Sequence, residues 1–267
     1  MPYLLRFISS QQSARASPNK CLAKKRYIFL SKYLEKNQNN LSNIKKSILP
    51  VLGIIFLFFA LIMLEPDFGT GMVIVLSLML ILFISGVKIK FFASLGILGI
   101  LGIAGLIIIA PYRLKRIISF LNPWSDPLGS GYQIIQSLYA IGPASLLGLG
   151  FGKSIQKQFY LPEPQTDFIF AIICEEFGIV GAISVIVLFI SLFYIILKIS
   201  LKQSNLFAKY LSFGLGMQII LQGALNLCVV TSLIPVTGVT LPFFSYGGSS
   251  LLVSMISVGI ILNICGS

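Results

Sequence analysis

Residues 161–198 read LPEPQTDFIFAIICEEFGIVGAISVIVLFISLFYIILK, and this stretch decides the fold. It opens with a polar, proline-containing segment and becomes strongly apolar from residue 168 onward. At about 1.5 Å rise per residue, the apolar part can cross a bilayer whose hydrocarbon core is about 30 Å thick. Gly178 and Gly181 lie where a helix of this length can tilt or kink. We therefore expect a long membrane-spanning helix that begins directly after a polar loop.

Three carboxylates lie at the start of this helix: Asp167, Glu175 and Glu176. Ionisable side chains inside a membrane are costly, so they are functional candidates. Asp167 has two interpretations, either a carboxylate that caps the helix and favours its dipole or a general base at the membrane boundary. Adjacent helical residues diverge by about 100°, so the two glutamates cannot both face one target. We expect one to support the site and the other to be structural, bonded by hydroxyls such as those of Thr231 or Ser232.

The composition places the whole chain in a membrane. Of its 267 residues, 56% are hydrophobic and only 10% are charged, where a soluble domain carries about 25% charged residues. The chain has no His, which removes the commonest neutral-pH base and metal ligand. Its four Cys have no paired spacing, which argues against a disulfide or zinc framework. We expect an all-α, polytopic bundle of transmembrane helices.

Six apolar segments define that bundle: 48–64, 72–87, 91–110, 168–197, 207–231 and 247–264. A basic, polar tail (residues 1–47) precedes the membrane domain (residues 48–267), and a surface helix of one or two turns is the most that we expect within the tail. Most of the 20 Lys and Arg lie on the side of the tail, so the positive-inside rule places it in the cytoplasm. The net charge of +12 then reflects topology and attraction to anionic lipid, and no nucleic acid partner is expected.

Three segments face the opposite side: residues 65–70, the long loop 111–167 and residues 234–249. The long loop contains Arg113, Lys115 and Arg116, which either snorkel to lipid phosphates or hold a pyrophosphate. Within residues 134–141 of this loop, apolar side chains recur at helical spacing, which predicts a helix at the membrane surface. The glycine-rich turn before the last span either caps that helix or binds an anion through backbone N–H groups, and Ser249 lies within it. Glycines 96, 99, 102 and 105 indicate close contact between helices.

Four motifs together resemble the SEDS family, the FtsW/RodA/SpoVE polymerases of peptidoglycan, and most closely its FtsW/SpoVE branch. The similarity runs from about residue 45 to the C-terminus. The matching stretches are EPDFGTGM (65–72), PYRLKRIISFLNPWSDPLGSGYQIIQSLYAIG (111–142), QKQFYLPEPQTDFIFAIICEEFG (156–178) and IPVTGVTLPFFSYGGSSLL (234–252).

The resemblance implies the last six spans of a ten-helix fold, in the plasma membrane, with an extracytoplasmic active face. It implies a peptidoglycan glycosyltransferase that polymerises lipid II during cell division or sporulation. Asp167 matches the family's essential aspartate, the general base, and Arg113, Lys115 and Arg116 match the basic residues expected to bind pyrophosphate. Glu176 and Ser249 are expected to support the substrate site. The implied partners are an undecaprenyl-pyrophosphate-linked glycan, a class B penicillin-binding protein and division proteins.

The sequence departs from this family in its first part, where four spans are missing. We interpret this as a truncated or damaged gene, in which residues 17–37 faintly resemble the fourth helix. Two alternatives to the enzyme stay open: a flippase that moves lipid-linked sugars, and an inactive scaffold that binds a transpeptidase. The sequence contains no metal ligand set, and a divalent cation (Mg²⁺ or Mn²⁺) near Asp167 is compatible with the expected chemistry.

Overall fold

The computed structural model describes residues 18–40, 48–63, 68–97, 99, 120–129, 131–143, 145–162 and 164–266. The regular elements of this described part are all helical. In chain order they are α2 (Pro18–Lys36), η1 (Gln38–Asn40), α3 (Leu49–Met63), α4 (Phe68–Ile84), η3 (Pro123–Ser125), α7 (Tyr132–Ile141), α8 (Gln156–Phe159), α9 (Ile169–Lys202), α10 (Leu206–Val230) and α11 (Gly248–Gly266). The expected all-α class is confirmed.

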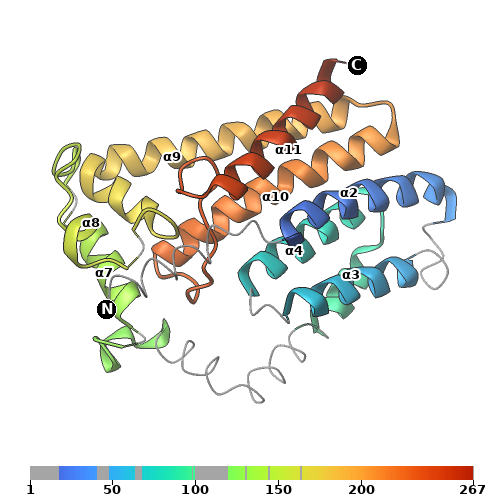
Figure 1. The fold of residues 1–267 in the computed structure, drawn as a ribbon. Helices are drawn as coiled ribbons and strands as arrows, with labels where there is room; N and C mark the ends of the chain where they lie inside the picture. The colour runs from blue at the N-terminus through green and yellow to red at the C-terminus, as the bar shows by residue number, and fades with distance from the viewer. Residues whose placement is uncertain are drawn as a thin grey trace.

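Three helices, α9, α10 and α11, are long and apolar enough to cross a membrane, and α4 contains a shorter apolar helix. Together with α3, these helices match five of the six expected spans. The remaining expected span, 91–110, is helical over residues 91–97, and most of its later residues lie outside the described part of the chain. The protein is a multi-pass membrane protein. In Figure 1, α9 and α10 run side by side, while α2, α3 and α4 form a second group beside α10.

Helix α10 is the centre of the bundle and contacts α9, α4, α2 and α11. Small residues permit these close approaches. A Cβ atom added to Gly214 would lie 2.3 Å from Ile81, and one added to Gly223 would lie 2.4 Å from Phe189. The expected close contacts at Gly96 and Gly99 do not occur among the described residues, because a Cβ there meets nothing within 4 Å.

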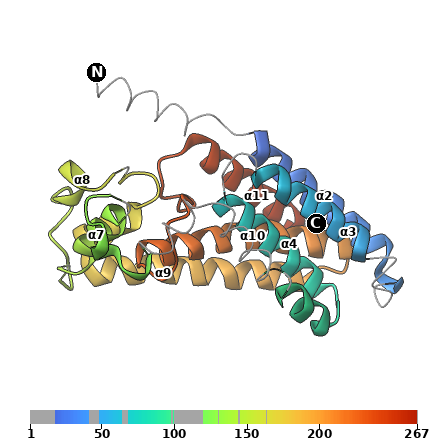
Figure 2. The same cartoon turned by 90° about the horizontal axis from the view of Figure 1, so that it is seen from below.

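Helix α2 departs from the tail that we expected for residues 1–47. It has 19 residues and packs one face into the core, where Tyr27, Leu30 and Leu34 are at most 3% exposed. Tyr27 also shares a buried hydrogen bond with Ser77 of α4. The three buried positions have the spacing i, i+3, i+7 of one helical face. This apolar face packs into the core although basic residues lie beside it in the sequence. Figure 2 shows α2 beside α3 and α4 at the same end of the bundle.

Helix α9 is two helical segments joined at Gly178. The backbone there has φ 65° and ψ −154°, a conformation that essentially only glycine adopts. The first segment, residues 169–177, runs in a different direction from the rest of α9 (Figure 1). The kink predicted from Gly178 is therefore confirmed, and it separates the Asp167 end of α9 from the long apolar part.

Candidate functional site

Asp167 lies in a turn directly before α9, and its side chain is partly exposed. The N-cap residue of α9 is Phe168, and no side chain caps this helix by a hydrogen bond. Asp167 therefore lies one residue before the N-cap position, and both of its interpretations stay predictions. Contacts from α10 and from the segment that precedes α11 hold the backbone of this turn.

Two side-chain amides on one face of α10 hold that segment in place. Asn226, which is fully buried, donates from Nδ2 to the backbone oxygens of Asp167 and Val239, both at 2.6 Å. Gln222, one turn earlier, donates from Nε2 to the backbone oxygen of Thr240 at 3.0 Å. Since residues at i and i+4 share a helical face, the two amides bind successive carbonyl groups of one extended segment. Asn226 therefore ties the Asp167 turn and residues 239–240 to the same helix.

A second set of bonds joins the two segments directly. The Ser245 hydroxyl donates to the backbone oxygen of Thr166 at 2.5 Å and accepts from the backbone N–H of Leu241 at 2.7 Å. The backbone N–H of Tyr246 donates to the oxygen of Gln165 at 2.8 Å. The residues that precede Asp167 are thus bonded at consecutive positions to the start of the SYGGSS turn.

Asp167 itself faces Gly238. A Cβ atom placed on Gly238, whose φ is 72°, would lie 3.6 Å from Oδ2 of Asp167. On its other flank the same segment meets the start of α4, because a Cβ on Gly69 would lie 2.7 Å from the oxygen of Thr237. Residues 237–239 therefore lie between the EPDFGTGM and PEPQTDF motifs. Phe243 adds a left-handed backbone (φ 69°), a conformation that is rare outside glycine and concentrates at functional sites.

Glu175 is the structural member of the glutamate pair. Its Oε2 accepts from the Ser154 hydroxyl at 2.5 Å, and its Oε1 accepts from the backbone N–H groups of Ile155 at 3.0 Å and Gln156 at 3.4 Å. Glu175 thus binds the start of the short helix α8. Thr231, whose hydroxyl we expected to bind a glutamate, instead donates to backbone oxygens of its own helix, α10.

Glu176 is 4% exposed, and its Oε1 has no hydrogen-bond partner in the described part of the structure. It lies beside the kink, where its backbone oxygen accepts from the N–H of Gly150 at 3.0 Å. Ser249 lies in the first turn of α11, next to Ser250, whose hydroxyl is 3.2 Å from that of Thr240. The support of the site by Glu176 and Ser249 stays a prediction.

The basic residues Arg113, Lys115 and Arg116 lie outside the described residues, as do residues 65–67 of the first motif. The predicted helix in the long loop is α7, and the Ser137 hydroxyl in it donates to the oxygen of Val230 at 2.8 Å. Helix α7 packs against α9, so the loop forms part of the structure around Asp167.

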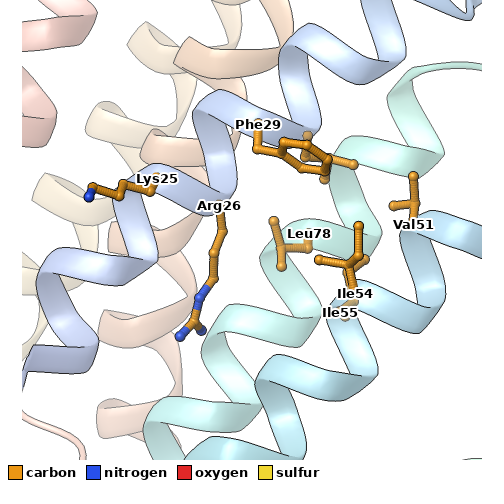
Figure 3. A pocket seen from close by; sticks show the side chains of 8 residues that line it. Lys25, Arg26, Phe29, Val51, Ile54, Ile55 and Leu78 are labelled. Carbon is orange, nitrogen blue, oxygen red and sulfur yellow. The ribbon is translucent and has the colours of Figure 1, made fainter.

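A cavity of about 340 Å³ lies elsewhere, between α2, α3 and α4 (Figure 3). It is lined by apolar side chains and by Lys25 and Arg26, and Asp167 is not part of its wall. Among the described residues, no group of three or more His, Cys, Asp or Glu could hold a metal ion. The divalent cation therefore stays a prediction.

Sequence reasoning missed Asn226, Gln222 and Ser245, which position the candidate base. A signal for the first two was available, because two amides four residues apart in an apolar helix are costly unless they are bonded. Nothing local to the sequence indicated that their partners would be residues 167, 239 and 240.

Comparison with known proteins agrees with the arrangement of these motifs. The family model described as "Cell cycle protein", which covers FtsW, RodA and SpoVE, matches residues 20–267. Stage V sporulation protein E of Bacillus subtilis (strain 168) is 49% identical over 236 residues, which cover 88% of this chain and 64% of that protein. A probable peptidoglycan glycosyltransferase FtsW of Coxiella burnetii is 41% identical over 240 residues, or 89% of this chain and 64% of that protein. The chain thus spans less than two thirds of the length of these relatives.

Two solved structures have the same fold. A chain of a peptidoglycan synthase complex, studied for the structural coordination of polymerization and crosslinking, matches with a TM-score of 0.74 and 27% identity. The match covers 93% of this chain and 69% of that one. The rod shape determining protein RodA of Thermus thermophilus matches with a TM-score of 0.60 and 23% identity, covering 91% of this chain and 64% of RodA. The match to RodA concerns the fold alone.

Proposed function

Because the chain belongs to the FtsW/RodA/SpoVE family, we propose that it carries the catalytic part of a peptidoglycan glycosyltransferase, which polymerises lipid II into glycan strands. The observation that supports this most directly is the position of Asp167. The turn that bears it is bonded to α10 through Asn226 and to residues 245–246, and its carboxylate faces Gly238. A base that acts on a substrate hydroxyl needs this kind of fixed backbone and accessible side chain.

In the proposed reaction, Asp167 accepts the proton of an acceptor sugar hydroxyl. The oxygen of that hydroxyl forms a bond to the anomeric carbon of the donor sugar. The bond between that carbon and the pyrophosphate oxygen breaks, and the undecaprenyl pyrophosphate leaves with the bonding electron pair. Attack opposite the leaving group inverts the anomeric configuration.

Arg113, Lys115 and Arg116 are proposed to bind the departing pyrophosphate, since guanidinium groups match phosphate oxygens in pairs. Ser249 would contribute near the exposed first turn of α11, where N–H groups favour an anion. Glu176 would act from the kink of α9. We place the reaction on the extracytoplasmic face, because basic residues are concentrated on the other side.

A class B penicillin-binding protein is the proposed partner. The solved complex that resembles this chain is described as coordinating polymerization with crosslinking, and crosslinking requires a transpeptidase. Co-purification with such a transpeptidase from detergent extracts of a strain that expresses both proteins tests this pairing, with a single-span membrane protein of unrelated function as control.

The test of activity uses a chimera in which this chain replaces the matching part of the Bacillus subtilis relative. With purified lipid II and its transpeptidase partner, we expect glycan strands on gels, and we expect Asp167→Ala to abolish them while the protein remains folded. Undiminished polymerisation by Asp167→Ala would remove the assignment of the base. Movement of lipid II across liposomes without polymerisation would favour the flippase, and transpeptidase binding without either activity would favour the scaffold.

A further inference from the structure

A short apolar loop, residues 145–151, lies against the kink of α9. Four of its side chains are large, apolar and exposed: Leu146 is 69% exposed, Leu147 75%, Leu149 47% and Phe151 83%. Such a dense group of exposed leucine and phenylalanine side chains marks an interaction surface.

Backbone hydrogen bonds fix this loop to α9. The N–H groups of Leu149 and Gly150 donate to the oxygens of Glu175 and Glu176 at 2.9 and 3.0 Å. In the other direction, Ile179 and Val180 donate to the oxygens of Ser145 and Leu146, both at 3.3 Å. A Cβ on Gly148 would lie 2.5 Å from backbone atoms of Glu176, so the two backbones are in direct contact. These contacts hold the loop in a fixed position against α9.

The apolar surface of the loop continues that of α9. The ring centroid of Phe151 is 6.0 Å from that of Phe177, and Ile179 and Val180 on the adjoining turn are 47% and 52% exposed. Further along α9, apolar side chains such as Val187 and Leu188 are also exposed. This part of α9 is long and apolar enough to cross a membrane. The loop thus extends the lipid-facing side of a spanning helix.

The length of α9 places the loop at the edge of the hydrocarbon. Between Glu176 and Lys198, α9 has no charged side chain. At about 1.5 Å per residue, the uncharged part after Gly178 covers about 30 Å, which is the thickness of the hydrocarbon core. If Lys198 lies at one boundary, Gly178 and the attached loop lie at the other.

The polar neighbours of the loop fit the headgroup layer. Lys153 and Lys157 follow it, and both are exposed. Tyr160 and Trp124, at the same end of α9, are 50% and 55% exposed, and such aromatic side chains are enriched at membrane–water interfaces. Lysine at this depth reaches lipid phosphates while its stem stays in an apolar layer.

From the exposure, attachment and depth of the loop, we infer that residues 145–151 insert into the lipid leaflet at the Asp167 end of α9, with Lys153 and Lys157 at the lipid phosphates. This inference does not depend on the proposed enzymatic activity. The loop would fix the depth of the α9 kink in the bilayer.

The test is spin labelling of the full chain in liposomes of phosphatidylglycerol and phosphatidylethanolamine, after the four native cysteines are replaced by alanine. A label at Leu147→Cys is compared with one at Leu188→Cys, in the middle of α9, and one at Ser204→Cys, in the exposed turn after α9. We expect oxygen dissolved in lipid to broaden the Leu147→Cys signal more than a water-soluble nickel chelate does, as at Leu188→Cys, and the reverse at Ser204→Cys.

A label at Leu147→Cys that the nickel chelate reaches as readily as at Ser204→Cys would overturn the inference, because the loop would then lie in water. Protection from both reagents would also overturn it, since the loop would then be covered by protein. Phe151→Cys provides an independent second position if Leu147→Cys does not fold. A label at Lys153→Cys should respond between the two references, as expected of the phosphate layer.

Discussion

Asn226→Leu is the substitution that most directly tests how Asp167 is held. Asn226 is fully buried and donates two hydrogen bonds of 2.6 Å, one to the oxygen of Asp167 and one to that of Val239. Leucine has a similar volume but donates no hydrogen bond, so both carbonyl groups lose this donor. Leaving a buried acceptor without a donor costs about 1–3 kcal/mol, and loss of the unpartnered Oδ1 of Asn226 offsets part of this cost.

We expect the turn around Asp167 to open more readily by about 2 kcal/mol, which corresponds to about 30-fold faster hydrogen exchange. Hydrogen exchange with mass spectrometry on the full chain in nanodiscs measures this in peptides that cover residues 164–170 and 237–243. Gln222→Leu is the matched control, because it removes an amide from the same face of α10 whose hydrogen bonds, within the described part of the chain, go only to Thr240 and Ser250.

The two variants should differ in one place. Asn226→Leu should accelerate exchange in both peptides, whereas Gln222→Leu should accelerate it only in residues 237–243. Unchanged exchange in residues 164–170 of Asn226→Leu would refute the reasoning, since the turn would then be held by something other than α10.

Three further substitutions test the surrounding structure. Gly178→Ala should lower the melting temperature in detergent far more than Gly152→Ala. Both positions have positive φ, where an alanine is strained by about 1–3 kcal/mol. Only the alanine at position 178 would also place its Cβ 2.2 Å from a backbone oxygen. Equal effects of the two would contradict a tight contact at the kink. Glu175→Gln weakens charge-assisted bonds to the start of α8 by about 1–3 kcal/mol, so limited proteolysis should cut the chain faster at Ser154 and Ile155. An unchanged cleavage rate there would argue against a structural role of Glu175. Tyr27→Ala should lower the free energy of chemical unfolding by about 3–5 kcal/mol. Lys32→Ala, on the exposed face of α2, should change that free energy by less than about 0.5 kcal/mol. An equally small value for Tyr27→Ala would mean that α2 does not belong to the core.

The spanning helices could be predicted because the length of an apolar run is a local property of the sequence. The same reasoning failed for α2, whose Lys24, Lys25 and Arg26 lower its mean hydropathy below that of a span. Its buried face, Tyr27 and Leu34 among others, is a periodic signal and not a compositional one. The family match from residue 20 agrees with the structure in including this helix.

The site was only partly accessible from sequence. Asp167 was identifiable because a carboxylate at the start of an apolar helix is costly. Its neighbours were not, because Asn226 on α10 and Gly238 in the segment before α11 come near it only through tertiary packing. The partner of Glu175 was equally hidden, because Ser154 lies 21 residues before it in the chain and no local pattern connects the two.

The kink has a mechanical consequence for the candidate base. Because α9 changes direction at Gly178, the turn that bears Asp167 is not a continuation of the membrane-spanning part of α9. Its position is defined by Asn226 on α10 and by Ser245 in the segment before α11. A tilt of the spanning part of α9, such as a change in bilayer thickness would cause, can therefore be absorbed at Gly178 while Asp167 and Gly238 keep their separation. A base that must remain within hydrogen-bond reach of a lipid-linked substrate is better placed on such an independently anchored turn than on the spanning helix itself.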